Sequence, residues 1–562
     1  MKDFKNAVIE CVPNFSEGVN MDIIKQITNE IESIAGVQLL DVDPGKATNR
    51  TVVTFVGNPH AVIDAAFLAI KKAGELIDMR NHKGEHPRMG ATDVCPLIPI
   101  SGITMEEAVV FANLLGKRVG EELGIPVYLY EYAAIAPYKT NLAEIRSGEY
   151  EGFAAKILKP EWKPDYGEAK FNEKSGATVI GVRDFLIAYN VNLNTTSTRR
   201  ANSVAFDIRE KGRQSKGADG KSVKDAQGEV VWEPGLLKSV KAIGWFIEEY
   251  GIAQISMNLT NANVTPLHVA FDTCCERATA RGMRVTGSEL VGLVPLNAIL
   301  EAGKYFLRKQ QRSVGISEAE IIKIAVKSMG LDELSPFDPQ KKIIEYRLKD
   351  ANLKKLVNMT VTGFAEETAS ESPAPGGGSI SAYCGALGAA LATMVANLSS
   401  HKKGWDSRWE EFSNYAENGQ SLMSELLDLV DEDTNAFNMI MSAFGLPKGN
   451  DAEKAARKAA IEAATINAIK VPFRSMELSY NSFDLIQAMA EKGNPNSVSD
   501  AGVGALCARA AVKGCYLNIK INAQDLTEHP EVKPLLEKAE AMNTGADVKE
   551  QEIWKLVLSK MK

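Results

Sequence analysis

The stretch that decides the fold of the amino-terminal half reads Val37-Gln38-Leu39-Leu40-Asp41-Val42 and is followed by Thr51-Val52-Val53-Thr54-Phe55-Val56. Both runs are rich in β-branched residues and follow each other without a helical pattern between them, so they predict two consecutive strands. Apolar residues at helical spacing precede the pair at 21–34 and follow it at 60–77. A further strand is expected on each side, at 7–12 and 94–100, which gives the order βαββαβ.

This order is that of the ferredoxin-like split unit, in which two helices cover one face of a four-stranded sheet. A further helix at 105–123 and a strand at 127–130 extend it. The same order recurs between Thr178 and Arg308, from a strand at 186–191 to a strand at 284–290. We therefore expect an α+β amino-terminal part made of two ferredoxin-like βαββαβ subdomains, at 1–185 and 186–330.

The carboxyl-terminal part has a different character, because β-branched runs disappear after about Lys342 and long helical patterns follow one another to the end. The pattern predicts a separate all-α helical-bundle domain at 351–562, with a kink or break at Pro472 in the helix expected at 452–492. The segment 331–350 contains Pro336 and Pro339 and is expected to be a linker. A multidomain chain agrees with a length of 562 residues.

The composition excludes several classes of protein. Acidic residues outnumber basic ones by 72 to 64, so the chain has no general attraction for nucleic acid or anionic lipid. We find no apolar stretch of the roughly 18 to 20 residues that cross a bilayer and no secretory signal pattern. The seven cysteines are scattered and form no C-x-x-C pair. We expect a cytoplasmic protein with no nucleic-acid and no membrane partner.

The first candidate site is the loop Gly84–Asp93 (GEHPRMGATD), which lies between a predicted helix and a predicted strand. Pro87 keeps His86 out of helical geometry, so His86 and Arg88 project from one rigid connection as a base and an anion clamp. Such a pair suits acyl-type transfer between an amine and a carboxylate-bearing partner. Asp43, at the end of a strand, could orient the imidazole. Equally, His86 could be a turn residue and Asp43 a cap.

The same loop offers a second interpretation, since His82, His86 and Asp93, with Glu85, are possible metal ligands. The pattern H-x-x-E-H matches an inverted zinc-peptidase motif, which requires a helix. Gly84 and Pro87 make a helix unfavourable here. We expect no metal, and a metal-dependent hydrolase that uses these three residues remains an alternative.

Two features of the helical part also attract attention. The apolar stripe Leu422, Leu426, Val430, Phe437 is completed by Asp433, a carboxylate in the core-facing row. Such a residue is paired, kept neutral by a raised pKa, or part of a site. Before another predicted helix, Gly376, Gly377 and Gly378 present backbone donors that suit an oxyanion or a ring carbonyl, or else form a flexible linker.

Several motifs of the amino-terminal part resemble glutamate formimidoyltransferase: Glu10–Gly18 (ECVPNFSEG), Leu40–Asp43 (LDVD), Thr48–Val52 (TNRTV), Gly84–Cys95 and Val291–Leu296 (VGLVPL). The carboxyl part is similar to formimidoyltetrahydrofolate cyclodeaminase in Pro373–Ser379 (PAPGGGS), Leu429–Asp433 (LVDED) and Asn494–Asp500 (NPNSVSD). In order and length, the chain resembles the bifunctional formimidoyltransferase–cyclodeaminase family over essentially its whole length.

The resemblance implies two reactions of histidine degradation: transfer of a formimidoyl group between N-formimidoyl-L-glutamate and tetrahydrofolate, then cyclodeamination of 5-formimidoyltetrahydrofolate to 5,10-methenyltetrahydrofolate with release of ammonia. Tetrahydrofolate, possibly polyglutamylated, would be a co-substrate, and the protein a homo-oligomer. A folate-binding scaffold without activity remains a further alternative. The segment Gly217–Pro234 is longer than in the family and is expected to be a surface loop.

The resemblance also assigns residues. It implies that His86 is the transferase histidine, that Asp433 is the cyclodeaminase aspartate and that Asp43 is a nearby acidic group. The family's folate-contacting stretch corresponds to Gly167, Glu168, Ala169, Lys170, Phe171, Asn172, Glu173, Lys174, Ser175 and Gly176. Arg88 and the three glycines Gly376, Gly377 and Gly378 are expected to bind substrate.

Overall fold

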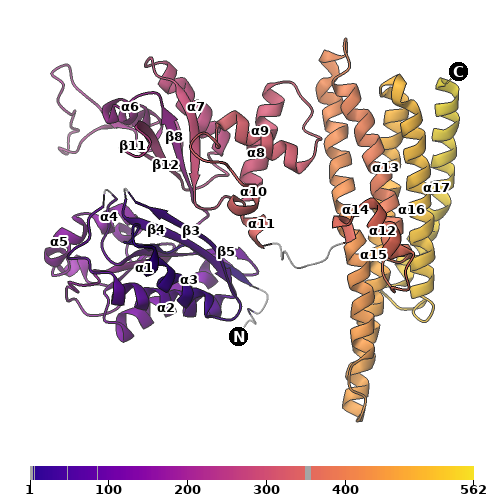
Figure 1. Cartoon of the computed structure of the whole chain (residues 1–562), viewed down its shortest axis with the longest axis horizontal. Helices are drawn as coiled ribbons and strands as arrows, with labels where there is room; N and C mark the ends of the chain where they lie inside the picture. Colours follow the sequence, from indigo (N-terminus) through magenta and orange to yellow (C-terminus); the bar gives the residue numbers. More distant parts are fainter. Residues whose placement is uncertain (1–3, 5–6, 47, 85, 349–355, 562) are drawn as a thin grey trace. The chain divides into compact units, whose positions relative to one another are not determined.

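The computed structural model describes residues 4, 7–46, 48–84, 86–348 and 356–561 (Figure 1). The chain divides into two compact units, each described by itself below. The first unit comprises Met1–Gly303 and Ala325–Lys349, and the second comprises Lys304–Ile324 and Asp350–Lys562. The first combines sheets and helices, and the second is helical, which confirms the expected multidomain organisation at this level.

The first sheet begins with four antiparallel strands in the order β3, β4, β1, β5. Their bounds are β1 (Val8–Cys11), β3 (Val37–Gly45), β4 (Arg50–Gly57) and β5 (Thr92–Ser101). The short β2 (Asn14–Phe15) pairs with both β4 and β5. Two parallel strands, β7 (Thr178–Val182) and then β6 (Val127–Glu131), continue the sheet from β5.

Helices cover both faces of this sheet. One face packs against α1 (Met21–Glu32), α2 (Pro59–Leu76) and α3 (Met105–Glu122), and the core between them contains Ile9, Phe55 and Leu97. Over β5, β6 and β7, the other face packs against α4 (Leu142–Arg146) and α5 (Glu149–Lys156) through Tyr128 and Phe153. The two short helices therefore lie on the same side of the sheet as the side chains of Arg50 and Tyr130.

The second half of the first unit forms a four-stranded antiparallel sheet in the order β11, β12, β8, β13. These strands are β8 (Ile187–Leu193), β11 (Val240–Ile247), β12 (Ile252–Leu259) and β13 (Val285–Val291). They alternate with α6 (Thr198–Ile208) and α7 (Leu267–Thr279). The sequence pattern located β8 and β13 at nearly these positions, because alternating apolar residues mark strands with one buried face.

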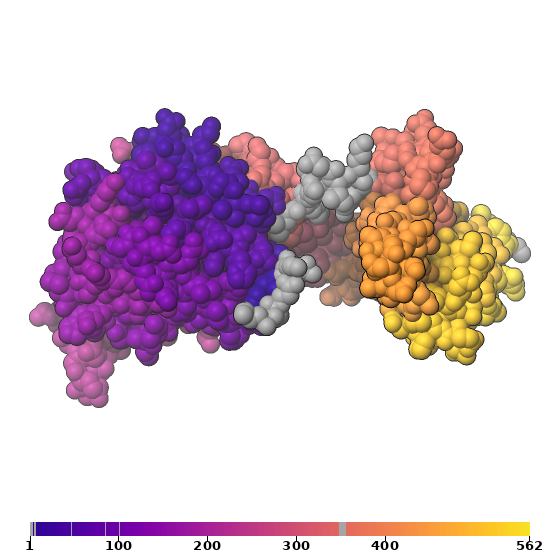
Figure 2. Space-filling model, turned by 90° about the horizontal axis from the view of Figure 1, so that it is seen from below, coloured from indigo at the N-terminus to yellow at the C-terminus, as the bar shows by residue number. Residues whose placement is uncertain are grey.

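The expected surface loop Gly217–Pro234 belongs to a hairpin whose ends are β9 (Arg213–Gln214) and β10 (Trp232–Glu233). Its backbone hydrogen bonds are made within the hairpin: Ser215 N–H donates to the carbonyl of Val231, and Val231 N–H to that of Val223. Figure 2 shows it as a magenta projection from the body of the first unit.

The segment 331–350, expected to be a linker, contains α10 (Pro339–Lys342) and α11 (Ile344–Leu348). Ile343 and Ile344 are buried, and Ile343 pairs with Val294 in an isolated bridge. The two prolines do punctuate the chain, but the apolar pair that follows them docks on the first unit. Part of the predicted linker, from residue 349 onwards, lies outside the described residues.

The second unit is a bundle of long helices with a short helix before them. They are α12 (Val361–Thr368), α13 (Gly377–Ser400), α14 (Trp409–Phe444), α15 (Asp451–Lys492), α16 (Val498–Asn522) and α17 (Lys533–Lys560). Alanine-rich faces of α13 and α16 meet apolar side chains such as Leu426 and Phe483 in one core. The break considered at Pro472 is absent, since α15 continues through this buried proline.

Two helices join the units along the chain, α8 (Leu296–Lys309) and α9 (Glu318–Met329). The connection Lys304–Ile324 belongs to the helical unit: the Lys304 ammonium contacts the Glu417 carboxylate at 2.7 Å, and Val314 N–H donates to Ser413 Oγ at 3.0 Å. A helical domain beginning at 351 would leave these contacts out.

One helix of the described residues, α13, is long and apolar enough to cross a membrane by length and composition, which corrects the expectation that the sequence has no such stretch. In its most apolar window, 61% of the residues are buried inside the protein. This burial is typical of the central helix of a bundle.

Candidate active sites

The loop around His86 is held between the segments that precede β4 and β7 and the residue that follows the carboxyl end of β2. A Cβ on Gly84 would lie 2.2 Å from the Thr48 carbonyl oxygen, and one on Gly90 would lie 2.3 Å from that of Ala177. Ser16 Oγ donates to the Gly90 carbonyl at 2.8 Å. Both glycines are therefore required by close approach of backbone segments, and they fix the path of the loop.

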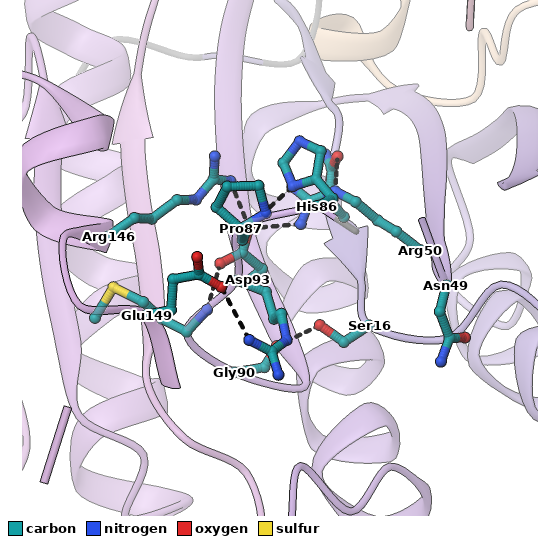
Figure 3. A network of polar contacts seen from close by, with 12 residues as sticks. Ser16, Asn49, Arg50, His86, Pro87, Gly90, Asp93, Arg146 and Glu149 are labelled. Atoms are coloured by element: carbon teal, nitrogen blue, oxygen red, sulfur yellow. Dashed lines mark hydrogen bonds and ion pairs between the residues drawn. The ribbon is translucent and has the colours of Figure 1, made fainter. Parts of the chain in front are cut away.

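Beneath the loop, one carboxylate is shared by two guanidinium groups (Figure 3). Arg50, at the start of β4, donates through Nη1 to Asp93 Oδ2 at 2.6 Å, and Arg146, at the end of α4, donates to the same oxygen. Met89 N–H donates to Oδ1 at 2.8 Å. Burial alone would raise the pKa of Asp93, but the guanidinium groups of Arg146 and Arg50 outweigh it and lower that pKa to about 2.

His86 lies beside this cluster with one ring nitrogen engaged. Its Nδ1 lies 2.7 Å from the Pro87 carbonyl oxygen, to which only a protonated Nδ1 can donate. Burial, and then the charges of Arg50 and Arg146, lower the pKa of His86 to about 3. The imidazole is thus neutral near pH 7 in the free protein, with the lone pair on Nε2, which is the form a general base requires.

Arg88, expected to be an anion clamp, is occupied by the protein itself. It is buried and makes ion pairs with Glu149 at 3.0 Å and Glu151 at 2.7 Å, both at the beginning of α5. Its Nε donates to Nδ1 of His82, whose Nε2 lies 2.8 Å from the Asn49 carbonyl oxygen. A cavity of about 420 Å³ opens beside these groups. Arg88 therefore braces the loop against α5.

The metal ligands considered for this loop have separate partners. His82 is bonded to Arg88 and Asn49, whereas Asp93 is bonded to two arginines. Within the described ranges, we find no group of three His, Cys, Asp or Glu side chains positioned to hold a metal ion.

Asp43 lies at the end of β3, and its Oδ2 accepts a hydrogen bond of 3.0 Å from Gly292 N–H. No described hydrogen bond joins it to His86. The carboxylate that acts electrostatically on the imidazole is Asp93, which raises the His86 pKa against the stronger opposite effects. The structure thus uses Asp43 to tie the first half of the unit to the segment that follows β13.

The stretch Gly167–Gly176 runs next to the His86 loop. Ala91 N–H donates to the Ser175 carbonyl at 2.8 Å, and Ala177 N–H donates to the Met89 carbonyl at 3.1 Å. The Phe171 ring packs against Tyr150 and Phe153, while residues 167–170 are exposed. A ligand held by this stretch would be adjacent to the loop of the candidate base.

In the helical unit, Asp433 of α14 meets the amino end of α13. Ser379 Oγ donates to Asp433 Oδ2 at 3.0 Å, and a Cβ on Gly378 would lie only 2.0 Å from Oδ1. No cation pairs with Asp433 among the described residues. Burial raises the pKa of its carboxyl group, and hydrogen bonds from Ser379 oppose that rise. A half-buried carboxyl with a raised pKa can deliver a proton.

The three glycines of the sequence motif differ in position. Gly376 precedes α13 as its N-cap residue, and Gly377 lies in the first turn beside the side chain of Asn518. The helix amino terminus contributes free N–H groups and partial positive charge next to Asp433.

Sequence reasoning missed Arg50 and Arg146 as site residues and considered Asp93 only as a metal ligand. Arg50 lies in the motif Thr48–Val52, which contributes to the family resemblance but does not indicate a chemical role for Arg50. Arg146 has no local signal, because only the fold brings α4 over β5.

Fold and geometry define a two-site enzyme, with one candidate centre in each unit. Three family models match the chain: "Formiminotransferase domain, N-terminal subdomain" at residues 8–183, "Formiminotransferase domain" at 188–349, and "Formiminotransferase-cyclodeaminase" at 360–541. The chain belongs to the formimidoyltransferase–cyclodeaminase family.

Named relatives agree with this membership. The chain is 43% identical to formimidoyltransferase-cyclodeaminase of Gallus gallus, with 93% of each chain covered. It is 41% identical to the protein of that name from Dictyostelium discoideum, covering 98% of this chain and 99% of the relative. Glutamate formimidoyltransferase of Streptococcus pyogenes is 41% identical and covers 54% of this chain and 93% of its own length.

Proposed function

We propose that the protein transfers the formimidoyl group of N-formimidoyl-L-glutamate to tetrahydrofolate and then cyclodeaminates 5-formimidoyltetrahydrofolate to 5,10-methenyltetrahydrofolate, releasing ammonia. The observation that supports this most directly is the complementary protonation of the two centres. In the first unit a neutral imidazole has its Nδ1 hydrogen-bonded and its lone pair on Nε2, and in the second a carboxyl group has a raised pKa. One centre is suited to remove a proton and the other to supply one.

In the transfer reaction, His86 takes a proton from the folate amine as that nitrogen adds to the formimidoyl carbon. The tetrahedral adduct then collapses, and the protonated imidazole returns the proton to the departing nitrogen of glutamate. Asp93 lies close enough to stabilise the imidazolium that forms between the two steps. The stretch Gly167–Gly176 holds the folate beside this centre.

In the cyclodeamination, a second folate nitrogen adds to the formimidoyl carbon, and the adduct must expel ammonia. An amide anion is too poor a leaving group, so the nitrogen must be protonated first. Asp433 supplies this proton, and the resulting carboxylate is stabilised by the Ser379 hydroxyl and the amino end of α13. The backbone N–H groups of Gly376, Gly377 and Gly378 at this helix terminus bind the substrate, and the missing side chain of Gly378 leaves room for the Asp433 carboxyl group.

Finer features belong to the same proposal. Each half of the first unit is a ferredoxin-like subdomain, an assignment supported by the antiparallel order of its second, third, first and fourth strands. Folate, with or without a polyglutamate tail, is the co-substrate, and no metal, nucleic acid or membrane takes part in a reaction in the cytoplasm. Self-association is supported by exposed apolar residues on α13 and α16, including Leu398, Leu517 and Ile521.

The experiment that tests the function is turnover of N-formimidoyl-L-glutamate with tetrahydrofolate by the full chain, before and after treatment with a chelator. We expect 5,10-methenyltetrahydrofolate and ammonia to appear in equal amounts, with no loss after chelation. A metal-dependent hydrolase would lose activity with the chelator. A scaffold would bind tetrahydrofolate and form no product.

Gly378→Ala is expected to lower cyclodeamination by about 10- to 100-fold and to leave transfer unchanged. The added Cβ would lie 2.0 Å from Oδ1 and 2.5 Å from Cγ of Asp433, so the carboxyl group must move. A displacement of about 1 Å at a reacting group can cost about 100-fold in rate. Conversion of supplied 5-formimidoyltetrahydrofolate measures the effect.

The matched control is Gly376→Ala, because a Cβ there would meet only the Pro373 carbonyl oxygen, at 3.9 Å. This variant should lose much less activity. Equal losses in both variants would show that the position of Asp433 is not what Gly378 protects.

A further inference from the structure

The cluster beneath His86 contains more positive than negative charge. Arg50 and Arg146 share the single carboxylate of Asp93, which is fully buried, and His86 beside them is neutral. The acidic pair at the start of α5, Glu149 and Glu151, is engaged by Arg88. Two fixed cations with one anion in a poorly solvated place favour a second anion as ligand.

The two guanidinium groups also keep unused donors. Arg50 donates through Nε to Asn14 Oδ1 at 3.0 Å and through Nη1 to Asp93, so Nη2 is without a partner among the described residues. The Nε of Arg146 is buried and likewise has no hydrogen-bond partner in the described part of the chain. A buried donor such as Arg146 Nε is normally satisfied, and Arg50 Nη2 is free to donate beside it, so the open positions point to a ligand.

The chemistry of the reaction identifies the anion. In N-formimidoyl-L-glutamate the departing nitrogen is the α-amino nitrogen, and the α-carboxylate is fixed two covalent bonds away from it. A base that acts on this nitrogen must therefore have the α-carboxylate close by. The glutamyl tail of the folate also ends in carboxylates, but the aminobenzoyl group separates them from the reacting nitrogen.

We propose that Arg50 and Arg146 form the subsite for the α-carboxylate of the glutamate portion of the substrate, next to His86 (Figure 3). This inference rests on the proposed transferase function. Planar guanidinium groups bind carboxylates through paired hydrogen bonds, which fixes orientation as well as charge. The subsite would hold the departing nitrogen within reach of Nε2.

Substrate binding at this subsite also affects the base. Burial, and then the charges of Arg50 and Arg146, lower the pKa of His86 to about 3 in the free protein, and a bound carboxylate offsets the effect of those two charges. The imidazole thus becomes a stronger base when the amino acid is bound. The acidic limb of kcat, which reports the complex, should lie at higher pH than that of kcat/KM for formimidoylglutamate, which reports the free enzyme.

The test compares three substrates with the full chain: N-formimidoyl-L-glutamate, its α-amide and its γ-amide. We expect kcat/KM to fall about 10- to 100-fold for the α-amide, the range for a charge-assisted hydrogen bond, and much less for the γ-amide. In Arg146→Gln, the parent and the α-amide should become nearly equal substrates, and Arg146→Lys should restore part of the difference. Circular dichroism and thermal unfolding of the same preparations show whether the first unit of each variant, which contains Arg146, is folded.

The outcomes separate the possible sources of the carboxylate. Tetrahydropteroate lacks the glutamyl tail of tetrahydrofolate. The loss of kcat/KM when it replaces tetrahydrofolate should be the same in wild type and in Arg146→Gln. If this loss of kcat/KM is instead smaller in Arg146→Gln than in wild type, the subsite binds the folate tail and the proposal is wrong. If the wild-type enzyme has the same kcat/KM for the α-amide as for N-formimidoyl-L-glutamate, the proposal is also wrong, and no variant is needed to show it. If wild type transfers nothing from formimidoylglutamate to tetrahydrofolate, the proposed function itself has failed.

Discussion

His86→Ala is expected to reduce formimidoyl transfer by about 10²- to 10⁴-fold, the range for loss of a general base, while cyclodeamination of supplied 5-formimidoyltetrahydrofolate continues. The reason is that no second imidazole replaces it: both ring nitrogens of His82, the only other histidine of the loop, are engaged by Arg88 and the Asn49 carbonyl. Separate assays of the two half-reactions on one preparation measure the effect.

His82→Ala serves as the matched control and should reduce transfer much less. It removes a partner of the buried Arg88 guanidinium, so we expect a lower melting temperature of the first unit together with the milder kinetic loss. Near-normal transfer by pure His86→Ala would sink the assignment of the base. A larger loss in His82→Ala than in His86→Ala would move that role to His82.

Asp433→Asn is expected to stop cyclodeamination, by about 10²- to 10⁴-fold, so that 5-formimidoyltetrahydrofolate accumulates while transfer continues. The amide has the size of the carboxyl group and can still accept the hydrogen bond from Ser379, but it has no proton to transfer. Quenched samples of the complete reaction, analysed for the intermediate, measure the effect.

Thermal unfolding of the same variant distinguishes catalysis from structure. No cation pairs with Asp433 among the described residues, so the loss of about 3 to 5 kcal/mol typical of a broken buried ion pair is not expected. Ser379→Ala should weaken cyclodeamination moderately, since it removes one donor to the carboxylate. A destabilised Asp433→Asn protein that cyclises at the normal rate per folded molecule would refute the catalytic role.

The sheets of the first unit could be predicted because their strands have one apolar face. The runs at 37–42 and 51–56 became β3 and β4 with nearly the expected bounds, since β-branched residues alternate between core and solvent. The placement of β7 between β5 and β6 could not be predicted, because strand pairing depends on contacts distant in sequence. The prolines of the segment 331–350 predict a linker. The buried side chains of Ile343 and Ile344 instead pack part of it against the first unit.

The candidate sites could be predicted only where one residue makes its own local signal. His86 stands in a turn with Pro87, and Asp433 interrupts an apolar helical stripe. Arg88 has the same kind of local signal, yet its guanidinium is taken by carboxylates about 60 positions later in the chain. Arg50 and Arg146 are brought to one carboxylate by tertiary packing alone, so the motif around Arg50 gives no chemical role for it and no pattern along the chain marks Arg146.

The hairpin between β9 and β10 has a practical value for work on this protein. Its backbone hydrogen bonds join residues of the hairpin to one another, its residues 225–229 are exposed, and it projects from the first unit. A spectroscopic label, an affinity tag or a surface tether attached near Asp225 would be anchored to the transferase unit through the paired strands β9 and β10. Immobilising the enzyme in this way would leave the loop of His86 and the helix α14, which contains Asp433, without a chemical modification.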